Sequence, residues 1–212
     1  MIKPFQEERV VMSPKLEKFA PLSGVVFLIL MAVVILALSN DSPDLDDSAG
    51  RILAYWRDHK NQQLVAGLLG GLASIALIWF GGSLRKAIDG VGGGSRLGGL
   101  ALVGAAVAGA GGLLISNMAF VTADSIGKVP AEATLTLNAL CAELFLPLTG
   151  GMFVMLAATA LATLYWGILP KWFGWVTAVI ALVMLTPVGF IGFLATILWA
   201  GVVGVWLFVR TR

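Results

Sequence analysis

The sequence predicts an all-α fold, a polytopic transmembrane helix bundle of about six spans with both ends in the cytoplasm. Hydrophobic residues make up 58% of the 212 residues and charged residues 12%, against roughly 45–50% and about 25% in soluble domains. The mean hydropathy is +0.93. The apolar residues form continuous blocks of about 20 residues or more, the length of helix that crosses a bilayer. Continuous blocks, unlike alternating ones, also exclude a transmembrane β-barrel.

Residues 1–20 are expected to form a cytoplasmic segment ahead of a transmembrane domain that covers residues 21–209. The apolar blocks place the spans at about 21–39, 64–82, 97–120, 139–168, 172–186 and 189–209. The last block is too long for one span, and the stretch Thr186-Pro187-Val188-Gly189 predicts a tight turn that divides it. The first run is longer than the usual core of a signal peptide, so we expect it to be retained as a span.

The positions of lysine and arginine predict the orientation, because cytoplasmic loops of membrane proteins are enriched in these residues. With the amino terminus inside, the cytoplasmic segments hold most of the 14 basic residues, and only Arg51, Arg57, Lys60 and Lys128 lie outside. Tryptophans favour the membrane interface. Those near the predicted inner boundary are Trp79, Trp166, Trp172, Trp175 and Trp206, whereas Trp199 lies in the middle of a span and is expected to serve packing.

Small residues recur at four-residue spacing in two predicted spans. The second span carries Gly67 and Gly71, and the third carries Gly104, Ala108 and Gly112. Helices in lipid associate through close backbone approach, which small residues permit. We therefore expect the third span to lie centrally in the bundle. The stripes indicate helix packing within one chain, with a homodimer face as the alternative.

Polar side chains gather near the predicted outer ends of the third and fourth spans. Ser116 and Asn117 end the third span, and Asn138 and Glu143 lie near the outer end of the fourth. Pro147 cannot donate a helical hydrogen bond to the carbonyl of Glu143, which predicts a helix kink. These residues form a candidate polar pocket open to the outer side. A carboxyl inside an apolar run is a candidate functional group, although at the interface the same carboxyl has a structural role.

An amphipathic helix is expected on the outer surface at about 48–62, because apolar residues recur there at helical spacing between charged ones. The aspartates just before it favour capping of this helix, since the glycine and distal glutamate of a calcium loop are missing. His59 and Cys141 are the only histidine and cysteine of the chain. We therefore expect no catalytic, cofactor or metal site.

Two stretches resemble a family of small multi-pass membrane proteins of unknown function that is common in actinobacteria. The first runs from Ile52-Leu53-Ala54-Tyr55-Trp56-Arg57-Asp58-His59-Lys60 to Gly82-Ser83-Leu84-Arg85-Lys86-Ala87, and the second is Leu169-Pro170-Lys171-Trp172-Phe173-Gly174-Trp175. The resemblance implies a six-span protein of the bacterial cytoplasmic membrane. It implies no activity and no catalytic residues.

Three classes of function stay open at this point. A non-enzymatic accessory or scaffold protein that binds membrane lipids or a membrane protein partner, including a second copy, fits the small-residue stripes best. A transporter or channel with a polar pocket near Glu143 is the alternative. A lipid-modifying enzyme has the least support, because no nucleophile–base pair is visible. The net charge of +2 does not suggest nucleic acid as a partner.

Overall fold

The computed structural model describes residues 18–38, 42–44, 46–92, 95–186 and 188–210, and this part of the chain contains helices and no strands. Predictions that concern most of the segment 1–20, together with Pro187, lie outside the described residues. The helices long and apolar enough to cross a membrane are Ala20–Leu38, Lys60–Asp89, Arg96–Ser125, Ala131–Trp166 and Gly189–Arg210. The chain is therefore an all-helical protein with five candidate membrane spans, which indicates a membrane protein.

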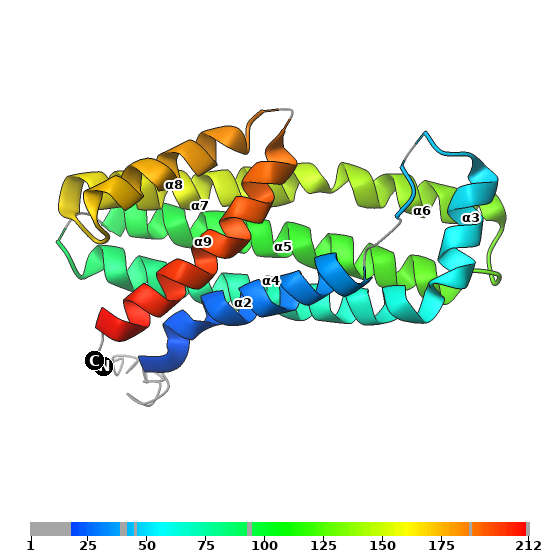
Figure 1. The fold of residues 1–212 in the computed structure, drawn as a ribbon, viewed down its shortest axis with the longest axis horizontal. Coiled ribbons are helices and arrows are strands. Elements are labelled where there is room, and N and C mark those ends of the chain that lie inside the picture. Colours follow the sequence, from blue (N-terminus) through cyan, green and yellow to red (C-terminus); the bar gives the residue numbers. More distant parts are fainter. Residues whose placement is uncertain (1–17, 39–41, 45, 93–94, 187, 211–212) are drawn as a thin grey trace, which may run out of the picture.

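The first span consists of η1 (Ala20–Leu22), α2 (Ser23–Val33) and a π-helical turn, η2 (Val34–Leu38). The remaining helices are α3 (Ala49–Asp58), α4 (Lys60–Asp89), α5 (Ser95–Ser125), α6 (Ala131–Glu143), α7 (Phe145–Trp166), α8 (Lys171–Val183) and α9 (Gly189–Arg210). In Figure 1, α4, α5 and α7 run side by side along the bundle, and α9 crosses them obliquely. Helices α3 and α6 lie together at one end of the bundle.

Helices α4 and α5 are longer than the predicted spans. They contain 30 and 31 residues, which at about 1.5 Å per residue exceeds the ~30 Å hydrocarbon core. The amphipathic helix predicted at 48–62 is correspondingly shorter, because α3 ends at Asp58 and α4 begins at Lys60. His59 leaves the helical conformation between them, and its ring stacks on Tyr55 with the ring centroids 4.7 Å apart.

The span predicted at 139–168 consists of two helices. Helix α6 begins at Ala131 and ends at Glu143, Leu144 forms a turn, and α7 begins at Phe145. The interruption therefore lies before Pro147, which occupies the first turn of α7. A proline is tolerated there because the first N–H groups of a helix have no intrahelical acceptor. The glycine after α7, Gly167, has a φ of 70°, the left-handed conformation that ends many helices.

The span predicted at 172–186 is a shorter helix. Helix α8 has 13 residues, fewer than the ~20 that cross a bilayer. Turns follow it, in which the N–H of Leu185 donates to Leu182 and that of Thr186 donates to Val183. The last apolar block thus contains two helices, α8 and α9, and its sixth span stays a prediction.

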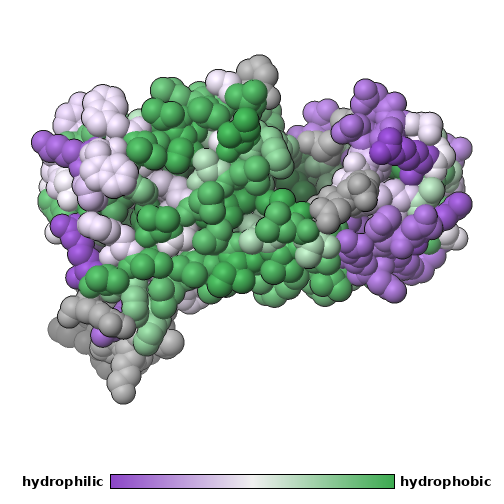
Figure 2. Space-filling view, in the orientation of Figure 1, coloured by the Kyte–Doolittle hydropathy of each residue, from purple (hydrophilic) through white to green (hydrophobic). Residues whose placement is uncertain are grey.

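Both ends of the described chain lie at the same end of the bundle. The rings of Phe19, before α2, and Phe208, in the last turns of α9, stack with centroids 5.7 Å apart. The guanidinium of Arg210 donates to the carbonyl oxygen of Ile168, between α7 and α8, at 2.5 Å. Figure 2 shows a broad apolar surface over α2, α8 and α9, and a strongly polar surface at the other end, around α3.

Tryptophans divide into an exposed and a buried group. The exposed ones are those predicted at the inner interface, Trp79, Trp166, Trp172, Trp175 and Trp206. Trp199 is buried, and its Nε1 donates to the Thr177 hydroxyl at 2.9 Å, so its predicted packing role is confirmed. Its ring also meets Phe80 edge to face.

Helix α5 lies between α4 and α7, as its small residues predict. A Cβ on Gly104 would collide with the backbone of Met155, and one on Gly151 would collide with the backbone of Ala108. On the side of α4, a Cβ on Gly67 would lie 2.8 Å from the carbonyl oxygen of Ser116. Gly71 instead has only an ordinary contact, 3.8 Å from the Leu113 side chain. Most of the stripes are thus used for packing within the chain.

Two neighbouring glycines of α7 provide a matched test of this packing. We expect Gly151→Ala to lower the free energy of unfolding by about 1–3 kcal/mol, because the added methyl group forces α5 and α7 apart. Gly150→Ala meets no atom within 4 Å and is expected to leave stability unchanged or raise it by up to about 1 kcal/mol. Denaturant titration in detergent micelles measures both. Equal effects at the two positions would contradict the close α5–α7 contact.

Candidate functional site

A cavity of about 370 Å³ lies where the apolar bundle meets its polar end, a volume in the ~300–1,000 Å³ range of small-molecule sites. Its walls come from α2, α3, α4, α5, α6, α7 and α9, together with residues 42–43. Figure 2 shows the surface hollowed between the apolar band and the polar end.

One end of the cavity is apolar. Phe27 and Met31 of α2, Leu77 of α4, Met152 of α7 and Phe193 of α9 line it. Phe27, Leu77 and Met152 are at most 2% exposed. These residues belong to the membrane-spanning part of the bundle, so this end offers a hydrocarbon-like environment.

The other end of the cavity carries a hydrogen-bonded cluster around Tyr55 and Gln63. The side-chain amide of Gln63 donates to the Tyr55 phenol oxygen at 2.6 Å and to the carbonyl oxygen of Leu38 at 3.0 Å. The phenol oxygen also lies 3.0 Å from the Ser42 hydroxyl. The neighbouring Gln62 donates to the carbonyl of Ala37 at 3.0 Å. Two glutamines at the start of α4 thus satisfy carbonyls that the end of the first span leaves open.

A second polar contact joins α3 to α6. The indole Nε1 of Trp56 donates to Oδ1 of Asn138 at 3.0 Å, and the Trp56 side chain is buried. Because Oδ1 accepts this bond, the orientation of the Asn138 amide is fixed and its Nδ2 group is a donor. Asn138 thereby joins α3 to the wall of the cavity.

The close contact of α4 and α5 beside the cavity rests on two reciprocal glycine–serine pairs. The Ser116 hydroxyl would lie 2.6 Å from a Cβ on Gly70, and the Ser74 hydroxyl would collide with a Cβ on Gly112. Ser74 also donates to the carbonyl of Gly70 at 2.9 Å. All four residues line the cavity. Since the helices run antiparallel, each glycine accommodates the serine of the other helix.

Of the four residues predicted to form a polar pocket, two line the cavity and two do not. Ser116 and Asn138 lie on the cavity wall. Asn117 and Glu143 are exposed and are not among the lining residues. Sequence reasoning missed Tyr55, Trp56 and Gln63 as members of the site. The apolar stripe of α3 was the available signal for Tyr55 and Trp56, because it shows which of its side chains face inward.

The cavity wall carries no ionised side chain among the described residues. Cys141 is half-buried on this wall, and its thiol donates to the carbonyl of Ile115 at 3.7 Å. The described residues contain no group of three or more His, Cys, Asp or Glu side chains that could hold a metal ion. Hydrogen bonding and apolar contact are therefore the interactions that the wall offers.

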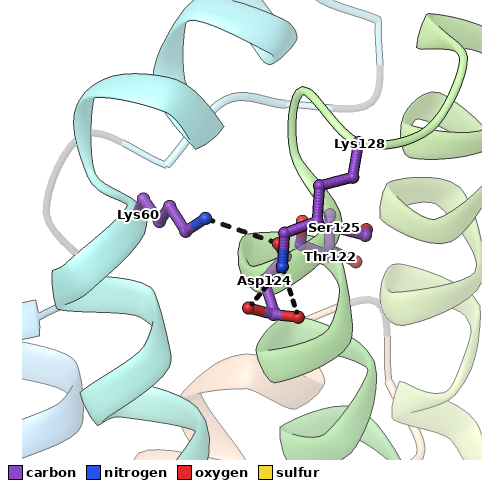
Figure 3. A network of polar contacts seen from close by, with 5 residues as sticks. All are labelled: Lys60, Thr122, Asp124, Ser125 and Lys128. Atoms are coloured by element: carbon purple, nitrogen blue, oxygen red, sulfur yellow. Dashed lines mark hydrogen bonds and ion pairs between the residues drawn. The ribbon is translucent and has the colours of Figure 1, made fainter.

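Charged residues at this end of the molecule lie outside the cavity. Figure 3 shows Lys128 beside the carboxylate of Asp124, with its Nζ 3.0 Å from both oxygens, and Lys60 reaching the backbone carbonyl of Asp124 at 3.4 Å. All three residues lie in exposed hydrogen bonds. Exposed ion pairs contribute at most about 1 kcal/mol each to stability. These lysines also complement the carboxyl end of α5.

Comparison of the chain with known protein families, curated proteins and solved structures gave no match. The resemblance of two stretches to an actinobacterial membrane family therefore stays a prediction, and the cavity alone carries the functional argument.

Asn138 on the cavity wall and Asn117 on the exposed surface provide a matched pair of variants. We expect Asn138→Ala to lower the free energy of unfolding by about 1–3 kcal/mol, because it leaves the buried indole N–H of Trp56 without its acceptor. Asn117→Ala, at an exposed position, is expected to change stability by less than about 0.5 kcal/mol. Thermal unfolding in detergent, followed by tryptophan fluorescence, compares the two. A harmless Asn138→Ala would argue against the contact between α3 and α6.

Proposed function

We propose that this protein is a non-enzymatic membrane protein that binds a lipid-like molecule in the cavity between its spans and its outer helices. The observation that carries this proposal is the polarity of the cavity wall. Phe27 and Met152 line an apolar end, whereas Tyr55 and Gln63 form a polar end. A molecule with an apolar chain and a polar head matches both ends at once.

The proposed orientation places the polar end of the cavity on the outer side of a bacterial cytoplasmic membrane. The basic residues on the connections near the other end, Arg85, Lys86 and Lys171, favour the cytoplasmic side. Both ends of the described chain lie there too, which agrees with an even number of crossings. We propose that α8, with the turns that follow it, supplies the sixth crossing as a hairpin with α9.

Binding is favoured over catalysis because the polar groups of the cavity engage one another. The Tyr55 phenol accepts from Gln63, Trp56 donates to Asn138, and the Cys141 thiol donates to a backbone carbonyl. None of these pairs a nucleophile with a base. A transport role for a pocket at Glu143 has less support, since this carboxylate is exposed away from the cavity wall.

Photo-crosslinking in reconstituted vesicles tests the proposed binding. A long-chain alcohol that carries a diazirine near the end of its chain is activated in the membrane, and the labelled peptides are mapped. We expect labels on cavity-lining residues of α4, α5 and α7, and loss of these labels when excess unlabelled alcohol is added. Equal labelling of all lipid-facing helix surfaces, without competition, would contradict the proposal.

Two alanine-to-leucine variants control this experiment. Ala66 is 7% exposed and lines the cavity, so Ala66→Leu is expected to reduce cavity labelling by reducing its volume. Ala110 is exposed on α5, and Ala110→Leu is expected to leave cavity labelling unchanged. If both variants lower the labelling equally, the probe does not report the cavity.

A further inference from the structure

A groove of about 640 Å³ lies between α2 and α9 on the outside of the bundle, and it shares no lining residue with the cavity described above. The two helices approach closely here because their facing residues are glycines. A Cβ on Gly204 would lie 2.7 Å from the carbonyl oxygen of Pro21, and one on Gly201 would meet the Leu28 side chain. The larger side chains on both sides of this contact form the walls of the groove. Both helices carry part of the broad apolar surface in Figure 2.

The groove is apolar along most of its length and has a charged residue, Arg210, at its end. Its α9 wall is built from residues spaced three and four apart, the spacing of one helix face, and Arg210 follows one turn after Trp206 on that face. From Gly201 to Arg210 the helix rises about 14 Å, roughly half of the ~30 Å hydrocarbon core. The groove therefore has the depth of one leaflet. Its apolar lining side chains are Val25 and Leu28 of α2 and Val202, Val205, Trp206 and Val209 of α9.

A hydrogen bond to the backbone holds the guanidinium of Arg210 at this end of the groove. One of its terminal nitrogens donates to the carbonyl oxygen of Ile168 at 2.5 Å. A guanidinium has five N–H donors in a planar fork that matches the oxygens of a phosphate, so this bond uses only part of its capacity. Trp206 is 43% exposed beside it, and an indole favours the boundary between hydrocarbon and head groups. The groove thus offers head-group contacts at one end and hydrocarbon contacts along the rest.

Further basic residues lie at the Arg210 end of the groove. Lys18 directly precedes Phe19, whose ring stacks on a phenylalanine of α9. Lys171 begins α8, three residues after the carbonyl that Arg210 contacts. Residues 1–17 contain three basic and three acidic side chains, so the charges of this segment do not reverse the positive charge. An anionic head group is attracted to such an end, whereas a head that carries its own ammonium group is partly repelled.

We infer that the groove between α2 and α9 binds a phospholipid of net negative charge, with its phosphate at Arg210 and one acyl chain along the apolar walls. The inference goes beyond the proposed function, because it concerns a second site and does not depend on what the cavity holds. A lipid bound in this way covers the glycine contact that joins the first span to α9.

Native mass spectrometry of the full chain in an uncharged detergent measures this binding. Phosphatidylglycerol and phosphatidylcholine with identical acyl chains are titrated separately, and the dissociation constant of the first bound lipid is determined for each. We expect phosphatidylglycerol to bind at least about fivefold more tightly, the effect of about one basic residue beside an anionic head. Equal dissociation constants would overturn the inference. Displacement of phosphatidylglycerol by equal concentrations of glycerol 3-phosphate would also overturn it, because the site would then recognise a phosphate without a chain.

Arginine variants test the contact with the head group. Arg210→Gln is expected to weaken phosphatidylglycerol binding about three- to tenfold and to change phosphatidylcholine binding less than about twofold. Arg210→Lys keeps the positive charge and should retain most of the preference. Arg57→Gln, at an exposed position of α3 at the opposite end of the bundle, should leave both dissociation constants unchanged. Equal losses in Arg210→Gln and Arg57→Gln would mean that charge acts without a defined site, which would contradict the inference.

Two valine variants test the contact with the chain and leave the bond of Arg210 to Ile168 in place. Val205 is 48% exposed and lines the groove, so Val205→Phe fills part of it and is expected to weaken phosphatidylglycerol binding about three- to tenfold. Val179, 58% exposed on α8 and outside the groove, is the control, and Val179→Phe should have no effect. Unchanged binding by Val205→Phe, or equal losses in both variants, would place the lipid elsewhere. A lipid-free dimer that dissociates in Val205→Phe would assign the groove to a second copy of the chain and overturn the inference.

Discussion

Close backbone contact of α5 with both α4 and α7 is the constraint on which the rest of this structure depends. In lipid the hydrophobic effect does not hold helices together, so contact must come from dispersion at short distance. Gly104 and Gly151 permit it between α5 and α7, and the pairs of Gly70 with Ser116 and Gly112 with Ser74 permit it between α4 and α5. A side chain larger than hydrogen at these glycines would separate α4, α5 and α7.

The cavity results from the way in which the other helices pack around α4, α5 and α7. The first span packs on α4 and α9, and its last carbonyls accept hydrogen bonds from Gln62 and Gln63. Helices α3 and α6 pack together at the polar end of the bundle, where the contact of Trp56 with Asn138 joins them. The apolar helices and the polar end of the bundle therefore meet around one volume, which gives the cavity its two chemically different ends.

The sequence predicted the elements with strong local signals. Composition and block length predicted an all-helical membrane protein, and the stripe of Gly104, Ala108 and Gly112 predicted the central place of α5. The sequence also placed Ser116 and Asn117 together near the end of the third span, but adjacent residues point about 100° apart on a helix. Which of the two faces the cavity depends on how α5 packs against its neighbours, and no local signal contains that information.

Side-chain contacts between residues that lie far apart in the chain could not be predicted from the sequence either. Trp56 and Asn138 are separated by 82 residues, and Tyr55 reaches Gln63 only because the chain leaves the helix at His59. The interruption at Leu144 was predicted only as a kink at Pro147, since a missing N–H shows where a helix is weakened but not where it ends. Helix α8 ends earlier than its apolar composition suggests, because hydrophobicity predicts burial in lipid and not helix length.

An experimental structure of the full chain in nanodiscs made from its native membrane tests the central claim most directly. The account predicts α5 in backbone contact with α4 and α7, and lipid-like density in the cavity between its polar and apolar ends. Helices α4 and α7 held away from α5, or a cavity closed by side chains, would contradict it.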